Sequence, residues 1–342
     1  MVGSFRHPFI RFSMRRDGKP ALHIPADFCS RFRANAYARA KLISMETPIH
    51  RPQPASPVYE VLSQSRADLE REALLGDGLR AALWRREQLE DTIYDRPTHH
   101  TLSLYLEDGY DVYLNGQPSR RGGPGKLCLL PAEHESYWRI NGRIRFVHFY
   151  FTQEQFGELA VRMLDREPRL LALRQNIYWE DDRLAGLGRQ LAAQHWQDSE
   201  SRLNANAIGH EMLAYLLLNH SDRQRGLPVR GGLAPTLRRR ALELIDHRLD
   251  GELTVGELAQ ALSLSEYHFA RMFRESVGEA PHRWIMRRRL ARARDLLSRG
   301  DLPLTVVAHR SGFSHASHLT RHFREALGVT PGIYRLWTQN RG

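Results

Sequence analysis

Two arginines stand at equivalent positions of a repeated sequence block and have the chemistry to contact the bases or phosphates of a nucleic acid. Arg271 and Arg321 lie 50 residues apart, and each opens the same pattern, R-x-F-R-E-x-x-G-x-x-P. A guanidinium can bond both hydrogen-bond acceptors of a guanine, or it can contact a phosphate. A repeat that keeps this register is a strong signal of a duplicated structural unit. The 50-residue spacing also pairs Phe273 with Phe323, Arg274 with Arg324, Glu275 with Glu325, Gly278 with Gly328 and Pro281 with Pro331.

Each copy is predicted to form a short helix, a turn and a second helix. In the first copy an apolar helix over 258–261 leads to a turn over 262–265 that ends in an N-cap serine. In the second copy residues 306–308 precede a turn that contains Gly312, which suits an unusual backbone angle. The second helices have an apolar inner face and a basic outer face, which predicts two helix-turn-helix units. The inner faces recur every four residues, at Phe269, Phe273 and Val277 and at Leu319, Phe323 and Leu327.

The segment over 236–334 resembles the DNA-binding domain of the AraC/XylS family of bacterial transcription regulators. The repeated block appears at 271–281 and again at 321–331. Arg289, Leu290 and Ala293 match the Arg-Leu-x-x-Ala positions of the long helix that joins the two units in that family. The resemblance implies an all-α domain over 236–337 that places its two outer helices in successive major grooves of DNA. The charge run at 238–240 is expected to be solvated or to contact phosphates.

The resemblance assigns the base-reading positions to the second helix of each unit. Ala270 is too short for a hydrogen bond, so it would contact a thymine methyl or nothing. Ala316 stands where the family often has a longer polar residue, and a phosphate contact remains the alternative for Arg321. The predicted DNA-binding residues are Tyr267, His268, Ala270, Arg271, Arg274, Ser317, His318, Thr320, Arg321 and Arg324.

The region over 57–152 is predicted to consist mainly of strands, so the fold class is α+β. Apolar residues alternate over 101–106, a hairpin turn follows at 107–109, and 111–114 is predicted as the return strand. Further strands are expected over 127–130 and 143–151. Short strands with turn residues between them predict a small barrel or sandwich. This region resembles the cupin-like sensor domain that many AraC-type regulators carry.

The histidines of this region raise the question of a metal site, and the sequence argues against one. His99 and His100 are adjacent, so on a strand they face opposite sides, and the usual cupin His-x-His pair is missing. We therefore expect no metal, no cofactor and no catalytic residue. An apolar cavity with a few polar groups could instead bind a small molecule, with plain core packing as the alternative. The candidate ligand-binding residues are His100, Tyr105, Trp138, His148 and Tyr150.

Helical spacing predicts a helical segment over 153–220. These helices could pair two subunits, as the resemblance implies, or pack against their own sheet. Residues 221–235 contain glycines, prolines and arginines and are predicted to form a linker.

The whole-chain composition favours a polyanionic partner. The chain has 342 residues, a net charge of +11 and a sequence pI near 10.0. Its two cysteines suit a reducing cytoplasm. No apolar run reaches the roughly 18 residues that a membrane span requires. The basic, acid-poor segment over 1–44 is expected to be a disordered arm or to lie upstream of a true start at Met45, so that its deletion should leave DNA binding intact.

Together these patterns predict a sequence-specific DNA-binding transcription regulator. The resemblance implies an activator that binds promoter DNA and recruits RNA polymerase, is controlled by a small-molecule effector, and forms a homodimer at the cytoplasmic nucleoid. Three alternatives remain open: a ligand-independent regulator, a non-specific architectural DNA-binding protein, and a cupin-type metalloenzyme tethered to DNA.

Overall fold

The structure, a computed structural model, describes residues 11–14, 20–23, 57–223, 231–300 and 302–340. The chain divides into two compact units, 1–55 and 56–342. In the first unit, strands β1 (Arg11–Met14) and β2 (Pro20–His23) pair antiparallel with Arg11 opposite His23. Most of the arm predicted over 1–44 lies outside the described residues.

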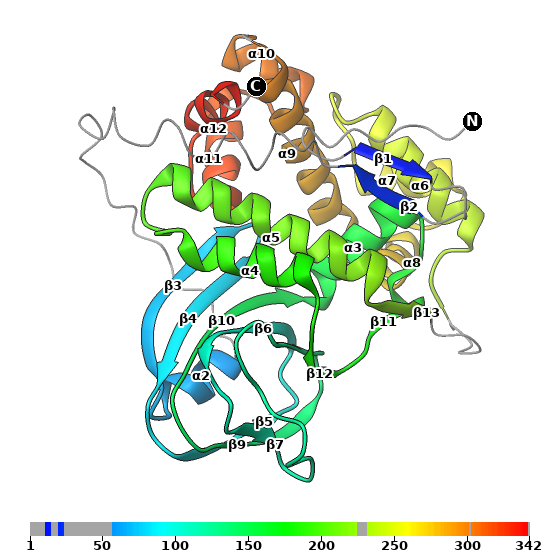
Figure 1. The fold of residues 1–342 in the computed structure, drawn as a ribbon. Coiled ribbons are helices and arrows are strands. Elements are labelled where there is room, and N and C mark those ends of the chain that lie inside the picture. Colours follow the sequence, from blue (N-terminus) through cyan, green and yellow to red (C-terminus); the bar gives the residue numbers. More distant parts are fainter. Residues whose placement is uncertain (1–10, 15–19, 24–56, 224–230, 301, 341–342) are drawn as a thin grey trace. The chain divides into compact units, whose positions relative to one another are not determined.

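The second unit begins with two antiparallel sheets (Figure 1). The large sheet has the strand order β12-β8-β6-β10-β4-β3, and the small sheet has the order β5-β9-β7. A short helix, α2 (Pro57–Ser63), precedes them. The strands are β3 (Asp68–Gly76), β4 (Leu79–Arg86), β5 (Glu90–Asp95), β6 (His99–Asp108), β7 (Val112–Leu114), β8 (Leu127–Leu130), β9 (Glu135–Ile140), β10 (Ile144–Thr152) and β12 (Asn176–Trp179).

The large sheet is buried on both faces, which explains why β6 has almost no exposed positions. Leu102 and Leu104 belong to a core shared with the helices that cover one face, as their alternation predicts. Ser103 and Tyr105 point to the other face, where Tyr105 packs in a second core formed with the small sheet and α2. We call the region from α2 to β10 the sensor domain, after the cupin-like sensor domain that its sequence resembles.

The predicted hairpin between 101–106 and 111–114 is wrong. β7 pairs with β9 of the small sheet, and β6 pairs with β8 and β10 of the large one. Since both edges of β6 are already occupied, the turn at Asp108 and Gly109, both with positive φ, sends the chain to the other sheet. Alternation identified these strands but not their partners, because it reports which face is buried and not which strand lies alongside.

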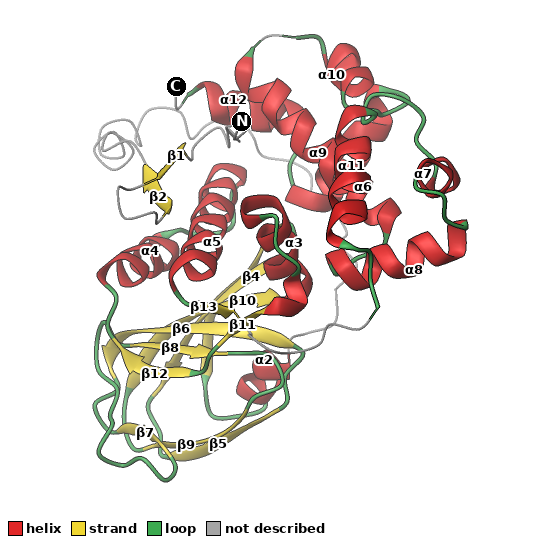
Figure 2. Cartoon of the chain, turned by 90° about the vertical axis from the view of Figure 1, so that its right-hand side faces the viewer, coloured by secondary structure: helices red, strands yellow, loops and turns green. Residues whose placement is uncertain are grey.

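The segment over 153–220 is helical in large part but also contributes strands. Its helices are α3 (Gln153–Leu164), α4 (Asp182–Ala193) and α5 (Ser199–Asn219), which share a core with the large sheet (Figure 2). β12 joins the edge of that sheet, and β11 (Leu171–Leu173) pairs with β13 (Ser221–Arg223) after the short helix η2 (Pro168–Leu170). Packing against its own sheet is therefore the observed role of this segment within one chain.

The C-terminal domain is all helical, as predicted. A capping box between Thr254 and Glu257 starts α7, and Ser265 caps α8 by accepting a hydrogen bond from the backbone N–H of His268. Gly278 and Gly328 end α8 and α11 in the left-handed conformation that favours glycine. The helices are α6 (Pro235–His247), α7 (Val255–Ala261), α8 (Glu266–Val277), α9 (Pro281–Arg299), α10 (Leu304–Arg310), α11 (Ala316–Leu327) and α12 (Pro331–Gln339).

Candidate DNA-reading surface and ligand cavity

The first candidate reading helix, α8, is held by an apolar inner face. Phe269, Phe273 and Val277 are buried in a core with α6, α7 and α9. Tyr267 is 80% exposed, so the apolar area of its ring faces solvent and is available for contact with a partner. Most of the DNA-binding residues predicted on α8 lie on its outward face, and Ala270 is only partly exposed. The exposed ones are Tyr267, His268, Arg271 and Arg274.

The second candidate reading helix, α11, has the same construction. Leu319, Phe323 and Leu327 are buried, whereas Ser317, Arg321 and Arg324 are exposed. His318 and Thr320 are partly exposed, and the Thr320 hydroxyl donates to the carbonyl of Ala316 at 2.8 Å. Thr320 therefore already uses its hydroxyl proton within the helix.

The four outward arginines of α8 and α11 differ from most other arginines of the C-terminal domain. Within the described residues, the guanidiniums of Arg271, Arg274, Arg321 and Arg324 make no hydrogen bond or ion pair. By contrast, six arginines of α9 bond a carboxylate or a backbone carbonyl, namely Arg287, Arg288, Arg289, Arg292, Arg294 and Arg299. Unpaired guanidiniums on two helices are available to an external anion such as a DNA phosphate or to a guanine edge.

Helix α9 fixes the two helix-turn-helix units relative to each other. Trp284 and Ile285 pack in the core of the first helix-turn-helix unit, and Leu297 is buried near the other end of the helix. Arg289, one of the residues of the resemblance, donates from Nε to the carbonyl of Leu249 at 3.2 Å and from Nη2 to that of Gly251 at 2.7 Å. Arg289 thus anchors the loop after α6 rather than facing DNA.

Gly312 makes the close approach between the second turn and this loop possible. Its φ is +79°, and a Cβ at this position would lie 1.8 Å from the Leu249 carbonyl oxygen. Only glycine fits such an approach, which explains the glycine predicted in this turn. The turn of the first unit reaches a positive φ at Ser263 instead.

The charge run on α6 mostly has intramolecular partners. Arg238 is buried and its Nη2 donates to the carbonyl and carboxylate oxygens of Asp165, at 2.8 and 3.1 Å. Arg239 bonds the other oxygen of the same carboxylate. The expectation of a solvated or phosphate-binding face is therefore wrong for Arg238, which is buried and pairs with Asp165 at the end of α3. Arg239 bonds the same carboxylate but keeps an exposed side chain, as the expectation of a solvated face has it.

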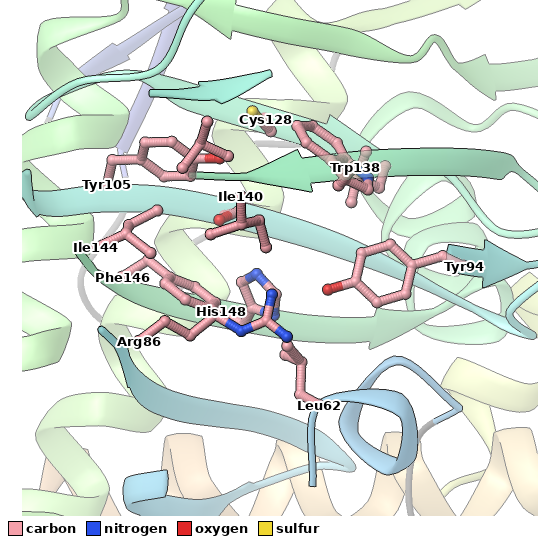
Figure 3. Close-up of a pocket in the computed structure, with 13 residues that line it drawn as sticks. Leu62, Arg86, Tyr94, Tyr105, Cys128, Trp138, Ile140, Ile144, Phe146 and His148 are labelled. Atoms are coloured by element: carbon pink, nitrogen blue, oxygen red, sulfur yellow. The ribbon is translucent and has the colours of Figure 1, made fainter. Parts of the chain in front are cut away.

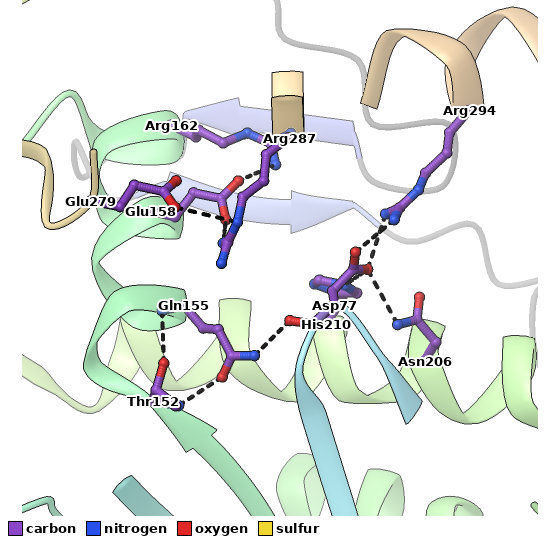
Figure 4. Close-up of polar contacts among 10 residues, drawn as sticks. All are labelled: Asp77, Thr152, Gln155, Glu158, Arg162, Asn206, His210, Glu279, Arg287 and Arg294. Atoms are coloured by element: carbon purple, nitrogen blue, oxygen red, sulfur yellow. Dashed lines mark hydrogen bonds and ion pairs between the residues drawn. The ribbon is translucent and has the colours of Figure 1, made fainter. Parts of the chain in front are cut away.

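A partly buried carboxylate on the β3–β4 turn connects the sensor domain to α9 (Figure 4). Arg294 donates to both oxygens of Asp77, at 2.6 and 3.0 Å, while His210 lies 2.9 Å and Asn206 3.3 Å from Oδ2. The backbone N–H of Asp77 donates to the carbonyl of Ala326 on α11 at 2.6 Å. Burial alone would raise the pKa of Asp77, but the charge of Arg294 and the hydrogen bond from His210 hold that pKa well below its usual range. The turn of the sensor domain is thus bonded to both α9 and a candidate reading helix.

A second polar cluster joins α3 to α9. Arg287 pairs with Glu158 and, at 3.5 Å, with Glu279. Glu279 is only 4% exposed, and neither of its carboxylate oxygens has a hydrogen-bond partner among the described residues. Burial raises the pKa of Glu279 to about 7, against the lowering effect of Arg287. This carboxyl group therefore titrates near neutral pH between the two domains.

The sensor domain contains a partly open cavity of about 40 Å³ between its two sheets (Figure 3). Three of the predicted ligand-binding residues, Tyr105, Trp138 and His148, line it. Burial lowers the pKa of His148 to about 3, so its imidazole is neutral at physiological pH. The cavity is mostly aromatic and apolar, with Leu62 of α2 on its wall.

The other two predicted ligand residues, His100 and Tyr150, are not among the cavity-lining residues. Nδ1 of His100 accepts from the backbone N–H of Ala132 at 2.9 Å, so Nε2 carries the proton and donates to Gln153 at 2.8 Å. Both nitrogens of His100 thus have structural partners. The Tyr150 hydroxyl lies 3.0 Å from Nδ1 of His148 and therefore orients a lining residue.

Arg86 is the charged residue among the cavity-lining residues that the sequence did not reveal. Its side chain is 1% exposed, with Nη1 donating to Thr92 at 2.8 Å and Nη2 to Glu90 at 2.6 Å. Its Nε has no hydrogen-bond partner among the described residues. Ala82, Trp84 and Arg86 alternate along β4 toward the core of the two sheets, so a period-two search could have placed this cation inside.

Neither a three-ligand metal cluster nor a membrane-spanning helix occurs in the part of the chain that the structure describes. No three histidines, cysteines or carboxylates come together there in a group that could hold an ion. No helix there is long and apolar enough to cross a bilayer.

Comparisons with known proteins concern the C-terminal domain above all. A helix-turn-helix domain family matches residues 258–336. A putative AraC-like transcription regulator of Streptomyces antibioticus is 32% identical over 41% of this chain and 46% of its own length. The transcriptional activator RhaS of Shigella sonnei is 27% identical over 69% of this chain and 86% of its own length. A crystal structure of the AdpA DNA-binding domain with a target DNA covers 30% of this chain and 94% of that chain, at 32% identity and a TM-score of 0.30.

The C-terminal domain is therefore a helix-turn-helix DNA-binding domain. It has two units joined by the long helix α9 and is similar to the AraC-like regulator among these relatives. The chain spans about a third to about half of the length of several curated relatives that it matches. The sequence expectation of an α+β chain with a C-terminal helix-turn-helix domain is confirmed.

Proposed function

We propose that this chain is a sequence-specific transcription regulator that activates promoters and is controlled by a small molecule in its sensor domain. The observation that carries this proposal is the set of four unpaired guanidiniums on the outward faces of α8 and α11, within an AraC-type domain. Relatives named as transcriptional regulators and activators support it. No catalytic role is proposed for any residue.

Both candidate reading helices are expected to contribute to base recognition. Arg271 and Arg321 occupy equivalent exposed positions, and guanine is the base that a guanidinium recognises best. Tyr267, His268, Ala270, Ser317, His318 and Thr320 would contact neighbouring bases, and Arg274 and Arg324 would contact bases or phosphates. One face of a duplex would then be read at two sites about 34 Å apart.

A random-library DNA selection with the full chain tests this function. A two-part motif with half-sites about one helical turn apart would support reading by both helices. A one-part motif would restrict base reading to one of them. Tight, salt-sensitive binding without any motif would instead indicate the architectural alternative.

The effector is proposed to bind in the cavity lined by Arg86, Tyr105, Trp138 and His148. A volume of about 40 Å³ holds only a few heavy atoms, so the enclosed part of an effector is expected to be small. Asp77 connects the sensor domain to α9 and α11, which gives a physical route from the cavity to the reading helices. Thermal shifts of wild type and an Arg86→Met variant against a small-molecule library test this: a hit that stabilises both equally does not bind here.

RNA polymerase and a second copy of the chain are proposed partners, as the sequence resemblance implies, and the cytoplasmic nucleoid is the proposed location. Transcription of a promoter bearing the selected motif, with purified polymerase and with and without the chain, tests activation. Light scattering with and without that DNA tests the homodimer.

A further inference from the structure

Two imidazoles on the second candidate reading helix converge in a way that the DNA-reading function does not require. His318 and His322 are one helical turn apart on α11, and their Nε2 atoms lie 3.1 Å from each other. Both residues are partly exposed, and Phe313 lies beneath their rings. The two nitrogens therefore face one point at the surface of the helix.

The other nitrogen of each ring is bonded to an oxygen. Nδ1 of His322 lies 3.0 Å from Oε2 of Glu325, and since a carboxylate only accepts, this Nδ1 carries the proton. Neutral His322 therefore presents the lone pair of Nε2 to His318. Nδ1 of His318 lies 3.1 Å from the hydroxyl of Ser314, which can donate or accept. His318 can thus expose a second Nε2 lone pair by changing its tautomer, without any net loss of a proton.

This arrangement has the geometry of a metal chelate. With metal–nitrogen distances near 2.05 Å, two nitrogens on one ion lie about 2.9 to 3.4 Å apart for angles from 90° to tetrahedral. The observed 3.1 Å falls within that range. Ligating histidines commonly donate their other N–H to a carboxylate, as His322 does to Glu325.

The surroundings restrict the kind of ion that the pair can bind, since Arg321 lies on the same helix. The nearby arginines disfavour any cation, so hard ions held mainly by charge are unsuited. Zn²⁺ and Cu²⁺, which bond imidazole nitrogen strongly, are suited. No third protein ligand joins the pair within the described residues, which leaves the remaining coordination positions to water.

We propose that His318 and His322 form a two-imidazole binding site for a divalent transition-metal ion such as Zn²⁺ or Cu²⁺, and that its occupancy weakens DNA binding. The metal takes up Nε2 of His318, a residue predicted to read a base, and places a hydrated ion on the surface of α11. The weakening of DNA binding by the metal rests on the proposed function, whereas the metal site itself does not.

The metal site is tested without DNA by calorimetric titration of the full chain with Cu²⁺. Wild type is expected to bind one equivalent that His322→Gln loses and that the matched control His282→Gln, an exposed histidine of α9, retains. Electron paramagnetic resonance at one equivalent should show two coordinated nitrogens in wild type and fewer in His322→Gln. Identical titrations for wild type and His322→Gln would overturn the site.

The weakening of DNA binding is tested on the duplex obtained by random-library selection, comparing each variant with its own metal-free affinity. Zn²⁺ should weaken wild type about fivefold to 150-fold, the equivalent of one lost base contact of 1–3 kcal/mol, and leave His322→Gln unchanged. Mg²⁺, which prefers oxygen ligands, should have no effect. Equal weakening of both variants by Zn²⁺ would refute this effect of the site. Failure to obtain a DNA motif would count against the proposed function while the Cu²⁺ titration still decides the site.

Discussion

Replacing Arg294 by methionine should destabilise the chain by leaving the partly buried Asp77 without its cation. Methionine keeps most of the apolar stem of the arginine, so the change removes charge and hydrogen bonds more than volume. Among the described residues, Asp77 would retain only His210 and Asn206 as side-chain partners. The free energy of unfolding should therefore fall.

The magnitude follows from the burial of the pair. Exposed ion pairs contribute about 0–1 kcal/mol, and breaking a fully buried pair costs about 3–5 kcal/mol. The side chains of Arg294 and Asp77 are 20% and 21% exposed, which places this pair between the limits, at about 2–3 kcal/mol. Because the pKa of Asp77 is depressed in the folded state, this contribution is complete above the ordinary pKa of 3.8 and is lost as pH falls through the folded value.

The assay is urea unfolding at pH 7 of Arg294→Met, Asp77→Asn and the double variant, which gives the coupling energy of the pair. Arg292→Met is the matched control, since this arginine of the same helix meets Asp250 at 3.7 Å with both side chains more than a third exposed. The control should change stability by less than about 0.5 kcal/mol. Additive effects of the two single variants, or equal losses for Arg292→Met and Arg294→Met, would refute the reasoning.

Three further predictions concern recognition, pH and the turn. Arg321→Ala should cost about 1–3 kcal/mol of DNA affinity and relax the preference at one base in a repeated selection, with exposed Arg174→Ala, between β11 and β12, as a neutral control; uniform weakening on all sequences would indicate a phosphate contact instead. Because the pKa of Glu279 is raised from 4.5 to about 7, the folded state retains a proton that the unfolded state releases, so stability should fall as pH rises through that window. Glu279→Gln lacks this decline, and the difference between the two proteins across the window should be about 3 kcal/mol in denaturant titrations; parallel pH profiles would contradict it. Gly312→Ala should lower stability by at least about 1–3 kcal/mol because of its positive φ and the blocked Leu249 carbonyl, whereas Gly186→Ala, an open position within α4, should be neutral or stabilising by up to about 1 kcal/mol.

Local patterns were sufficient for the C-terminal domain. The inner faces at Phe269 and Phe273 and at the equivalent Leu319 and Phe323 follow from a four-residue spacing, and the N-cap serine and the Gly312 turn follow from backbone chemistry. Because the inner faces are buried, the arginines on the opposite faces are exposed. These features depend on residues within a few turns of one another, which is why one sequence reveals them.

Pairings between distant segments were decided by the tertiary structure. The strand over 112–114 was recognised, but its partner is β9 rather than β6, since alternation carries no information about register between strands. Arg238 was grouped with a solvated charge run although Asp165, 73 residues earlier, neutralises it. His100 was assigned to a ligand cavity that it does not line, because a strand buried on both faces hides which face encloses the cavity.

The sequence by itself determined that the chain ends in two helix-turn-helix units and which helix faces carry the basic side chains, because helical period and capping are local properties. Only the tertiary structure placed Arg86 in a cavity, bonded Asp77 to Arg294 on α9, and brought the Nε2 atoms of His318 and His322 together with Ser314 and Glu325 on their far sides. Each of these depends on the direction of individual side chains in space. The direction of a side chain depends on its burial, its rotamer and its bonding partner, and the spacing of residues in a sequence gives none of these.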